Sequence, residues 1–260
     1  MSLYKTEAIV LKSNNLGEAD KIITLFSSDR GKIRAVARGA RRPRNRLAAA
    51  TQPFCYSDFL IFEGKNLDSI SQCQIKESFL KIREDLEKML YSTYIAELVN
   101  EFLPEGEEDK AVFSLVLKTF YSILNNLDIE LTTRVFELQF VAMMGYMPNL
   151  ENCSICGGKL TEFMIYFSPE AGGALCSKCV SKIPAPYGDV SITPGCIKIK
   201  KATIEVLKSF LRISLTNLRA IKLPKDIKKE MKQTLRIFID YHLNKKLKSL
   251  SLLNKITLNN

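Results

Sequence analysis

Four of the seven cysteines stand in two C-x-x-C pairs, a spacing that is typical of a metal site. The first pair is Cys153 and Cys156, the second is Cys176 and Cys179, and nineteen residues separate the pairs. The two-residue gap allows both thiolates of a pair to face one ion, and two pairs complete a tetrahedron. We therefore predict one structural zinc ion per chain. Two disulfides, a redox C-x-x-C pair and an iron–sulfur cluster are the alternatives.

The residues between the two pairs favour the metal site. FMIYFS at 163–168 predicts a strand, PEAGG a turn and ALC a return, so a hairpin would bring the second pair back to the first. A closed four-sulfur site has no open position for water, so the ion should hold structure and perform no chemistry. The remaining thiols, Cys55, Cys73 and Cys196, are expected to be buried or neutral.

The usual catalytic groups are missing from the sequence, and we predict no catalytic residue. The single histidine, His242, has no second imidazole to act with, and no H-x-E element stands beside a cysteine pair. The chain contains no phosphate-cradling G-x-x-x-x-G-K-[ST] motif and no H-E-x-x-H. The acidic run EGEED at 105–109 could hold magnesium in a nuclease, but a solvated charge run is the preferred interpretation. These patterns favour a binding protein over an enzyme.

The stretch RGKIRAVARGARRPRNR, residues 30–46, holds eight Arg or Lys in seventeen positions and no acid. Its first half predicts a strand in which alternate side chains share a face, so that the cations lie opposite Ile33, Ala35 and Ala37. Its second half predicts a loop. Arginine binds phosphate in a bidentate fork, which favours a nucleic-acid surface over a charged edge that merely discourages strand pairing. The predicted DNA-binding residues are Lys32, Arg34, Arg38, Arg41, Arg42, Arg44 and Arg46.

The net charge of +10 is unevenly distributed along the chain. Residues 1–76 have a net charge of +6, residues 77–130 of −7, residues 131–197 of −1 and residues 198–260 of +12. Two basic regions flanking an acidic middle favour a polyanionic partner. The C-terminal region could hold a second DNA strand or an acidic partner, although a solvated helix face is nearly as good an interpretation. Its basic residues are Lys225, Lys228, Lys229, Lys232, Arg236, Lys245, Lys246 and Lys248.

The elements that must position these residues change in character along the chain. Residues 1–78 contain five strand-length patterns with turn signals, which suit a small barrel such as the oligonucleotide-binding (OB) fold, with a small sandwich as the alternative. The sequence does not show which of Phe54, Tyr56 and Phe59 faces outward. No apolar run is long enough to span a membrane, and the start lacks the layout of a secretory signal, so a cytoplasmic protein is expected.

From residue 79 the apolar positions recur with helical spacing. Helices are predicted over 79–103, 111–127, 131–147, 201–215 and 226–256, with a Pro- and Gly-rich loop at 182–195. We therefore predict a multidomain α+β protein in which one helical domain carries an inserted four-cysteine zinc finger. The predicted domains are 1–78, a nucleic-acid-binding OB barrel; 79–150, the first part of the helical domain; 151–182, the zinc finger; and 183–260, its basic second part.

The chain resembles the bacterial DNA repair and recombination mediator family RecO along essentially its whole length. The resemblance rests on GKIRAVARGARRPRNR followed by QPF, on RVFELQFVAMMGYMPNLENCSICG, on CSKC and on IDYHLNKKLKSLSLL, in this order and spacing. Asn45 stands where the family often has Ser, and Asn244 where it often has Gly, but the neighbouring cations are kept. Some family members lack the four cysteines, which agrees with a structural rather than a catalytic metal.

The resemblance implies an N-terminal OB barrel, a helical domain and a zinc finger. It also implies binding to single- and double-stranded DNA, annealing of complementary strands, a complex with RecR, and assistance in loading RecA onto DNA coated by single-strand-binding protein. The acidic C-terminal tail of that coating protein would bind the helical region, where Arg134 is a candidate carboxylate anchor. A location at the nucleoid follows from these expectations.

Two other functions remain as alternatives. A zinc-ribbon transcription or RNA-binding factor would share the charge and the zinc but would lack annealing activity. A metal-dependent nuclease would use the acidic run at 105–109. Because no nucleotide site is present in the sequence, annealing would have to proceed without ATP, by neutralising phosphate repulsion and holding the strands close.

Overall fold

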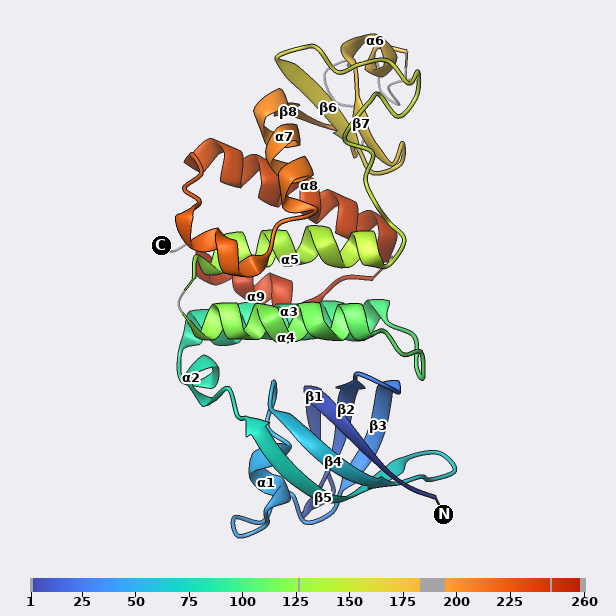
Figure 1. Ribbon diagram of the computed structural model, residues 1–260, viewed down its shortest axis with the longest axis vertical. Helices are drawn as coiled ribbons and strands as arrows, with labels where there is room; N and C mark the ends of the chain where they lie inside the picture. The colour runs from blue at the N-terminus through green and yellow to red at the C-terminus, as the bar shows by residue number, and fades with distance from the viewer. Residues whose placement is uncertain (1, 126, 183–194, 244, 258–260) are drawn as a thin grey trace. The chain divides into compact units, whose positions relative to one another are not determined.

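The computed structural model describes residues 2–125, 127–182, 195–243 and 245–257. The chain packs as two compact units (Figure 1). Unit 1 comprises Met1–Ile129 and Leu247–Asn260, and unit 2 comprises Glu130–Lys246. The predicted helical segments are therefore shared between the two units. The predicted domain limits stay predictions, and most of the predicted loop at 182–195 lies outside the described residues, as does Asn244.

A closed barrel of five strands forms the N-terminal part of unit 1 (Figure 1). The strands are β1 (Leu3–Leu16), β2 (Asp20–Ser27), β3 (Gly31–Ala37), β4 (Tyr56–Phe62) and β5 (Asp68–Glu77). Their order around the barrel is β1-β2-β3-β5-β4, and β3 with β5 is the one parallel pair in it. This topology confirms the predicted five-stranded barrel and removes the sandwich alternative.

Alternation along β3 determines which of its side chains fill the barrel. Ile33, Ala35 and Ala37 are buried in the barrel core, and the residues between them are half-buried or exposed. The short helix α1 (Leu47–Ala50) adds Leu47 and Ala50 to the same core. Four residues are too few to show helical periodicity, so this helix was not predicted.

The helix predicted over 79–103 is two helices, α2 (Leu80–Arg83) and α3 (Leu86–Phe102). The break comes at Asp85, which is extended and caps α3 by accepting a hydrogen bond from the backbone N–H of Lys88 at 3.1 Å. The periodicity across the break is nearly continuous, which explains the error. A second aspartate, Asp109, caps α4 (Lys110–Leu124) in the same way.

Aromatic contacts join the barrel to these helices within unit 1. Phe54 in the loop before β4 and Phe79 before α2 both meet Phe120 of α4, with ring centroids 5.4 and 5.7 Å apart. Phe26 of β2 contacts Phe113 at 5.6 Å. The edge-to-face geometry of all three pairs is the one that aromatic quadrupoles favour.

The last helix of the chain also belongs to unit 1. The sequence predicted one helix over 226–256, whereas the structure has α8 (Lys225–Leu243) and a separate α9 (Lys248–Thr257). Glu97 of α3 accepts hydrogen bonds from the backbone N–H groups of Lys248 and Ser249, at 3.0 and 2.8 Å. A carboxylate at the first turn of a helix satisfies otherwise unpaired donors, so α9 begins where it meets α3.

Unit 2 combines helices with a small sheet. Its described helices are α5 (Ile129–Met143), the short α6 (Ser177–Val180), α7 (Lys201–Phe210) and α8, with a 3₁₀ helix at Leu215–Ala220. Gln139 of α5 donates to the carbonyl oxygens of Phe210 and Ile213, both at 2.8 Å. Among the described residues, no helix is both long and apolar enough to cross a bilayer.

The sheet of unit 2 has the order β7-β6-β8. The hairpin of β6 (Met164–Ser168) and β7 (Gly173–Leu175) confirms the predicted strand, turn and return. The third strand, β8 (Ile197–Lys200), was not predicted. Four residues running straight into α7 do not show strand periodicity, and their pairing with β6 is set by tertiary structure.

Candidate nucleic-acid interface and metal site

The basic loop after β3 is an ordered turn that displays its arginines. Asn45 organises it: its side-chain amide donates to the Arg38 carbonyl oxygen at 3.1 Å and accepts from the backbone N–H of Leu47 at 2.8 Å. Asp20 accepts from the backbone N–H of Gly39 at 2.7 Å. The exposed side chains of this segment are Arg38, Arg41, Arg42, Arg44 and Arg46.

Two of the predicted DNA contacts hold the fold together. The ammonium of Lys32 is half-buried and donates to the carbonyl oxygens of Asn100 and Leu103, at 2.9 and 2.7 Å. A cation at the end of α3 is favoured by the helix dipole. Arg41 donates to the carbonyl oxygen of Gly17. These hydrogen bonds to carbonyl oxygens were not predicted from the sequence. Contact of Lys32 or Arg41 with DNA stays a prediction.

None of the three aromatic residues considered for base stacking presents a free ring. Phe54 and Phe59 are buried. Tyr56 is half-buried, its hydroxyl donates to Glu7, and the Lys76 ammonium lies 5.1 Å from its ring centroid. Phe62 at the end of β4, which no sequence pattern distinguished from the other aromatic residues, is 40% exposed.

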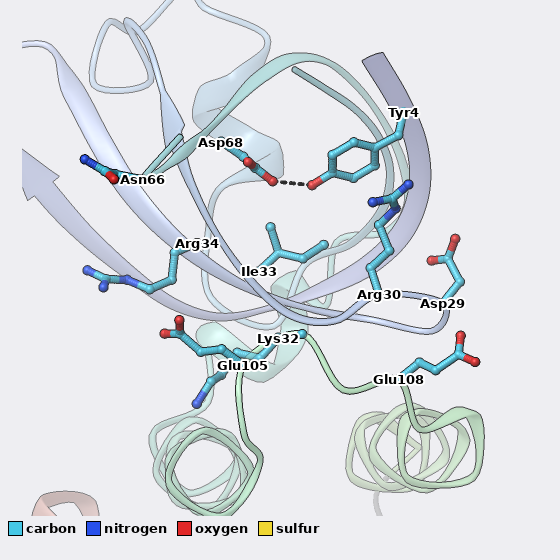
Figure 2. A pocket seen from close by; sticks show the side chains of 11 residues that line it. Tyr4, Asp29, Arg30, Lys32, Ile33, Arg34, Asn66, Asp68, Glu105 and Glu108 are labelled. Atoms are coloured by element: carbon cyan, nitrogen blue, oxygen red, sulfur yellow. Dashed lines mark hydrogen bonds between the residues drawn. The ribbon is translucent and has the colours of Figure 1, made fainter. Parts of the chain in front are cut away.

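A cavity of about 600 Å³ opens beside β3 at its Gly31 end (Figure 2). Charged side chains of both signs surround it, from β3, the start of β5 and the acidic run after α3. The acidic run at 105–109 is therefore packed beside the basic strand. It does not form a metal site: among the described residues, the cysteines are the only metal-ligating group of three or more side chains.

The basic residues predicted as a second surface are divided between the two units. Lys248 belongs to unit 1 and the other seven belong to unit 2. Lys232 forms an ion pair with Glu130 at 3.5 Å, and Arg236 pairs with Asp240 at 2.7 Å. The side chains that are largely exposed are Lys225, Lys229, Lys245, Lys246 and Lys248.

Arg134 is buried within α5. Its side chain is 4% exposed and pairs with Glu137, which is 1% exposed, at 2.9 Å. Opening a buried pair leaves an uncompensated charge and is costly. A partner's carboxylate could reach the guanidinium only if this pair opened, so the role of Arg134 as a tail anchor stays a prediction.

The four cysteines of the two C-x-x-C pairs come together in unit 2. Their Sγ atoms all lie within 4.8 Å of one another, and the Sγ atoms of Cys156 and Cys176 are 3.9 Å apart. A zinc ion bound at about 2.3 Å by four thiolates requires sulfur–sulfur distances of about 3.8 Å, so the arrangement fits such an ion. Cys156 is exposed and the other three are buried.

Backbone turns shape this site. The N–H of Gly157 donates to the carbonyl oxygen of Cys153 at 2.9 Å, and Gly157 has a φ of 70°, which a glycine adopts readily. The second pair lies at α6 (Ser177–Val180), where Glu162 accepts from the N–H and the hydroxyl of Ser177. Both pairs are therefore held in place by the chain around them.

The electrostatics of the site favour a bound cation. Burial opposes ionisation of Cys153, but N–H groups of Ile155, Cys156 and Cys176 point at its sulfur and lower the pKa of this thiol to about 6. Burial and the three neighbouring thiols raise the pKa of Cys179 to about 12. Four thiolates repel one another without a cation between them, and a divalent ion relieves that repulsion.

The other cysteines agree with the prediction of neutral thiols. Burial raises the pKa of Cys55, of Cys73 and, to about 11, of Cys196. His242 lies among the rings of Tyr146, Phe238 and Tyr241, and burial lowers the pKa of its imidazole. Among the described residues His242 has no carboxylate partner, so its imidazole, enclosed by aromatic rings, has the environment of a structural residue.

The fold and the two sites define a class of protein: a multidomain α+β chain with a closed five-stranded barrel, a helical region and a four-cysteine site that could hold a metal. The family models for the N-terminal and C-terminal parts of Recombination protein O match residues 1–79 and 83–251. The chain therefore belongs to the RecO family, and its barrel is an OB fold.

Individual relatives agree over nearly the full length. A DNA repair protein RecO from Desulforamulus reducens is 38% identical over 256 residues, which cover 98% of this chain and 96% of that protein. Its counterpart from Pelotomaculum thermopropionicum is 38% identical over 255 residues, covering 98% and 95%. That of Symbiobacterium thermophilum is 35% identical over 259 residues, covering 98% of each chain.

Proposed function

We propose that this protein is a recombination mediator in DNA repair. It binds single- and double-stranded DNA, anneals complementary strands without ATP, and with RecR helps to load RecA onto DNA coated by single-strand-binding protein. It acts as a binding protein and not as an enzyme, at the nucleoid. Membership of a family whose relatives are named DNA repair proteins supports the general role.

The observation that carries the proposal is the run of exposed arginines on an ordered turn of the OB barrel. Guanidinium groups bind phosphate oxygens in pairs, and phosphate contacts give affinity without sequence preference. Annealing needs this combination, because the protein must neutralise two repelling backbones whatever their sequence. The exposed lysines of α8 are candidates for the second strand or for the acidic tail of the coating protein.

We further propose that the four cysteines hold one zinc ion. Their donor set and spacing suit zinc, and a closed site would stabilise the small sheet of unit 2 without taking part in any reaction. The ion would fix the ends of the β6–β7 hairpin by joining its two flanking C-x-x-C pairs.

Annealing of two complementary labelled oligonucleotides tests the proposal. The wild type is compared, without ATP, with a variant in which Arg38, Arg42, Arg44 and Arg46 are replaced by alanine; both are first shown to be folded. We expect the wild type to accelerate annealing and the variant to lose most of that effect. Failure of the wild type to accelerate annealing would contradict the proposal.

A comparison of binding to RNA and to DNA separates the second candidate, a zinc-ribbon RNA-binding factor. Such a protein would discriminate through the 2′-hydroxyl, so it would bind a single-stranded RNA much more tightly than DNA of the same sequence. We expect similar affinities for the two, because the arginine turn contacts phosphate. Addition of Mg²⁺ should give no cleavage products, whereas cleavage would support the nuclease alternative.

A further inference from the structure

The cavity at the Gly31 end of β3 is lined by more acids than bases (Figure 2). Its charged lining residues are four carboxylates, Asp29, Asp68, Glu105 and Glu108, and three cations, Arg30, Lys32 and Arg34. Figure 2 shows these residues around one hollow; they come from the turn between β2 and β3, from β3, from the start of β5 and from the loop between α3 and α4. The charged residues of β3 itself are all basic. The net charge around its Gly31 end is nevertheless close to zero.

The acidic loop is fastened to the strand by its backbone. The N–H of Gly106 donates to the carbonyl oxygen of Lys32 at 3.2 Å, and Glu105 forms a parallel bridge with Lys32. Gly31 has a φ of 63°, and a Cβ placed on it would lie 2.0 Å from the carbonyl oxygen of Glu107. Because the two segments touch this closely, the carboxylates of the loop stay beside β3.

Two of the three cations around the cavity are engaged by the protein itself. Lys32 donates to carbonyl oxygens at the end of α3. The guanidinium of Arg30 lies 3.9 Å from the ring centroid of Tyr4, whose hydroxyl donates to Asp68. Arg34 is exposed and forms no hydrogen bond or ion pair with a described residue, so its whole guanidinium is open to a phosphate, whereas Arg30 offers only the N–H groups at the edge of its stacked guanidinium.

The carboxylate of Asp29 is held in its charged form. Burial raises its pKa, but hydrogen bonds from the hydroxyls of Thr6 and Ser27 outweigh burial and lower the pKa below its usual value. Negative charge at the Gly31 end therefore persists at neutral pH.

The other end of β3 has the opposite character. Residues 38–46 contain five arginines and no acid. Arg38 lies four positions after Arg34, about 13 Å along an extended chain at 3.3 Å per residue. This exceeds the Debye length of about 8 Å at physiological salt, so the two ends are separate electrostatic environments.

We propose that Glu105 and Glu108 exclude DNA phosphates from the Gly31 end of β3 and direct the bound strand to the turn formed by residues 38–46. Arg34 is then no DNA contact in the wild type, although its side chain is exposed and lies in the basic stretch. The inference rests on the proposed function, since it concerns the path of the DNA on the same barrel. The two glutamates are specificity-determining residues that act by repulsion.

A double-mutant cycle tests this inference. Affinity for a fluorescent single-stranded oligonucleotide is measured for wild type, Arg34→Ala, Glu105→Gln/Glu108→Gln and the triple combination. Glu84→Gln/Glu87→Gln is the matched control, because it removes two exposed carboxylates from the same unit away from β3. Arg38→Ala is measured in both backgrounds to report on the turn.

We expect Arg34→Ala to change the affinity of the wild type by less than about twofold. Neutralising Glu105 and Glu108 should raise the affinity about fivefold at low salt, and Arg34→Ala should then remove most of that gain. The control pair should change little, and Arg38→Ala should weaken binding in both backgrounds.

Two results would overturn the inference in distinguishable ways. If Arg34→Ala costs the same several-fold loss in both backgrounds while Arg38→Ala also weakens binding, DNA reaches the Gly31 end and the acidic loop does not exclude it. If Arg38→Ala leaves binding unchanged throughout, the barrel turn is not the DNA surface, and the proposed function fails together with the inference.

Discussion

At the scale of single residues, Lys32 and Arg34 share one face of β3, but Lys32 is half-buried and Arg34 is exposed. Alternation along β3 placed Lys32 and Arg34 on the face opposite Ile33, and the burial of these residues agrees. The partners of Lys32 are carbonyl groups of Asn100 and Leu103, about seventy positions away in the chain. No local pattern encodes such a contact, so Lys32 and Arg34 were indistinguishable in the sequence.

The close contact between Gly31 and the acidic loop leads to a prediction on stability. Gly31→Ala should lower the free energy of unfolding by more than about 2 kcal/mol, because it adds a clash with the Glu107 backbone to the cost of about 1–2 kcal/mol for a left-handed alanine. Gly17→Ala is the control: it has a similar φ of 56° and no atom within 4 Å, so only the conformational cost applies. Equal losses in urea denaturation would show that the loop does not rest on Gly31.

The ion pair of Glu7 and Lys76 leads to a prediction on pH. Hydrogen bonds from Lys76 and then Tyr56 lower the pKa of Glu7 below its ordinary value of 4.5. A carboxyl with a lowered pKa contributes stability that is fully present above 4.5 and is lost as the pH falls through the folded-state value. The stability difference between wild type and Glu7→Gln, measured by urea denaturation from pH 7 to pH 3.5, should therefore shrink at the acidic end. A difference that is constant over this range would contradict the assignment.

At the scale of elements, long periodic segments were predicted well and their ends were not. α4 and α5 lie where the helical spacing placed them, but α5 ends at Met143 and not at 147, just before Gly145 with its φ of 86°. The errors are a helix broken at Asp85, a separate α9, and β8, which is only four residues long. The break at Asp85 is a local cap that leaves the periodicity nearly continuous. The start of α9 and the pairing of β8 depend on contacts with distant residues, such as that of Glu97 with the start of α9, which periodicity does not contain.

The spacing of the four cysteines correctly predicted that their sulfur atoms come together in one cluster. Cys153→Ser and Cys176→Ser should each reduce bound zinc from about one per chain to near none and lower the melting temperature, because three thiolates no longer close the tetrahedron. Cys196→Ser, at a thiol near β8 outside the cluster, should keep its zinc. Metal content by atomic emission and thermal unfolding are the measurements. Retention of full zinc by Cys176→Ser would contradict a four-sulfur site.

At the scale of the whole molecule, charge is separated into surfaces with different roles. The barrel turn at 38–46 is purely basic, the loop beside β3 is acidic, and α8 adds exposed lysines in unit 2. Net charge per segment was visible in the sequence and favoured a polyanionic partner. The docking of the acidic loop on β3 was not visible, because residues 31 and 107 are brought together only by the packing of α3 and α4 against the barrel.

The central claim is that the arginine turn of the barrel holds single-stranded DNA, and the salt dependence of binding tests it most directly. Each lost phosphate contact should reduce the slope of log affinity against log salt concentration by about 0.7, so replacing Arg38, Arg42, Arg44 and Arg46 by alanine should reduce it by up to about 3. The matched control replaces four exposed lysines of unit 2, Lys225, Lys229, Lys245 and Lys246, and so removes the same net charge. We predict a large fall in slope and affinity for the arginine variant and a clearly smaller one for the control. Equal effects of the two variants would contradict the account, because binding would then follow total charge and not the barrel turn.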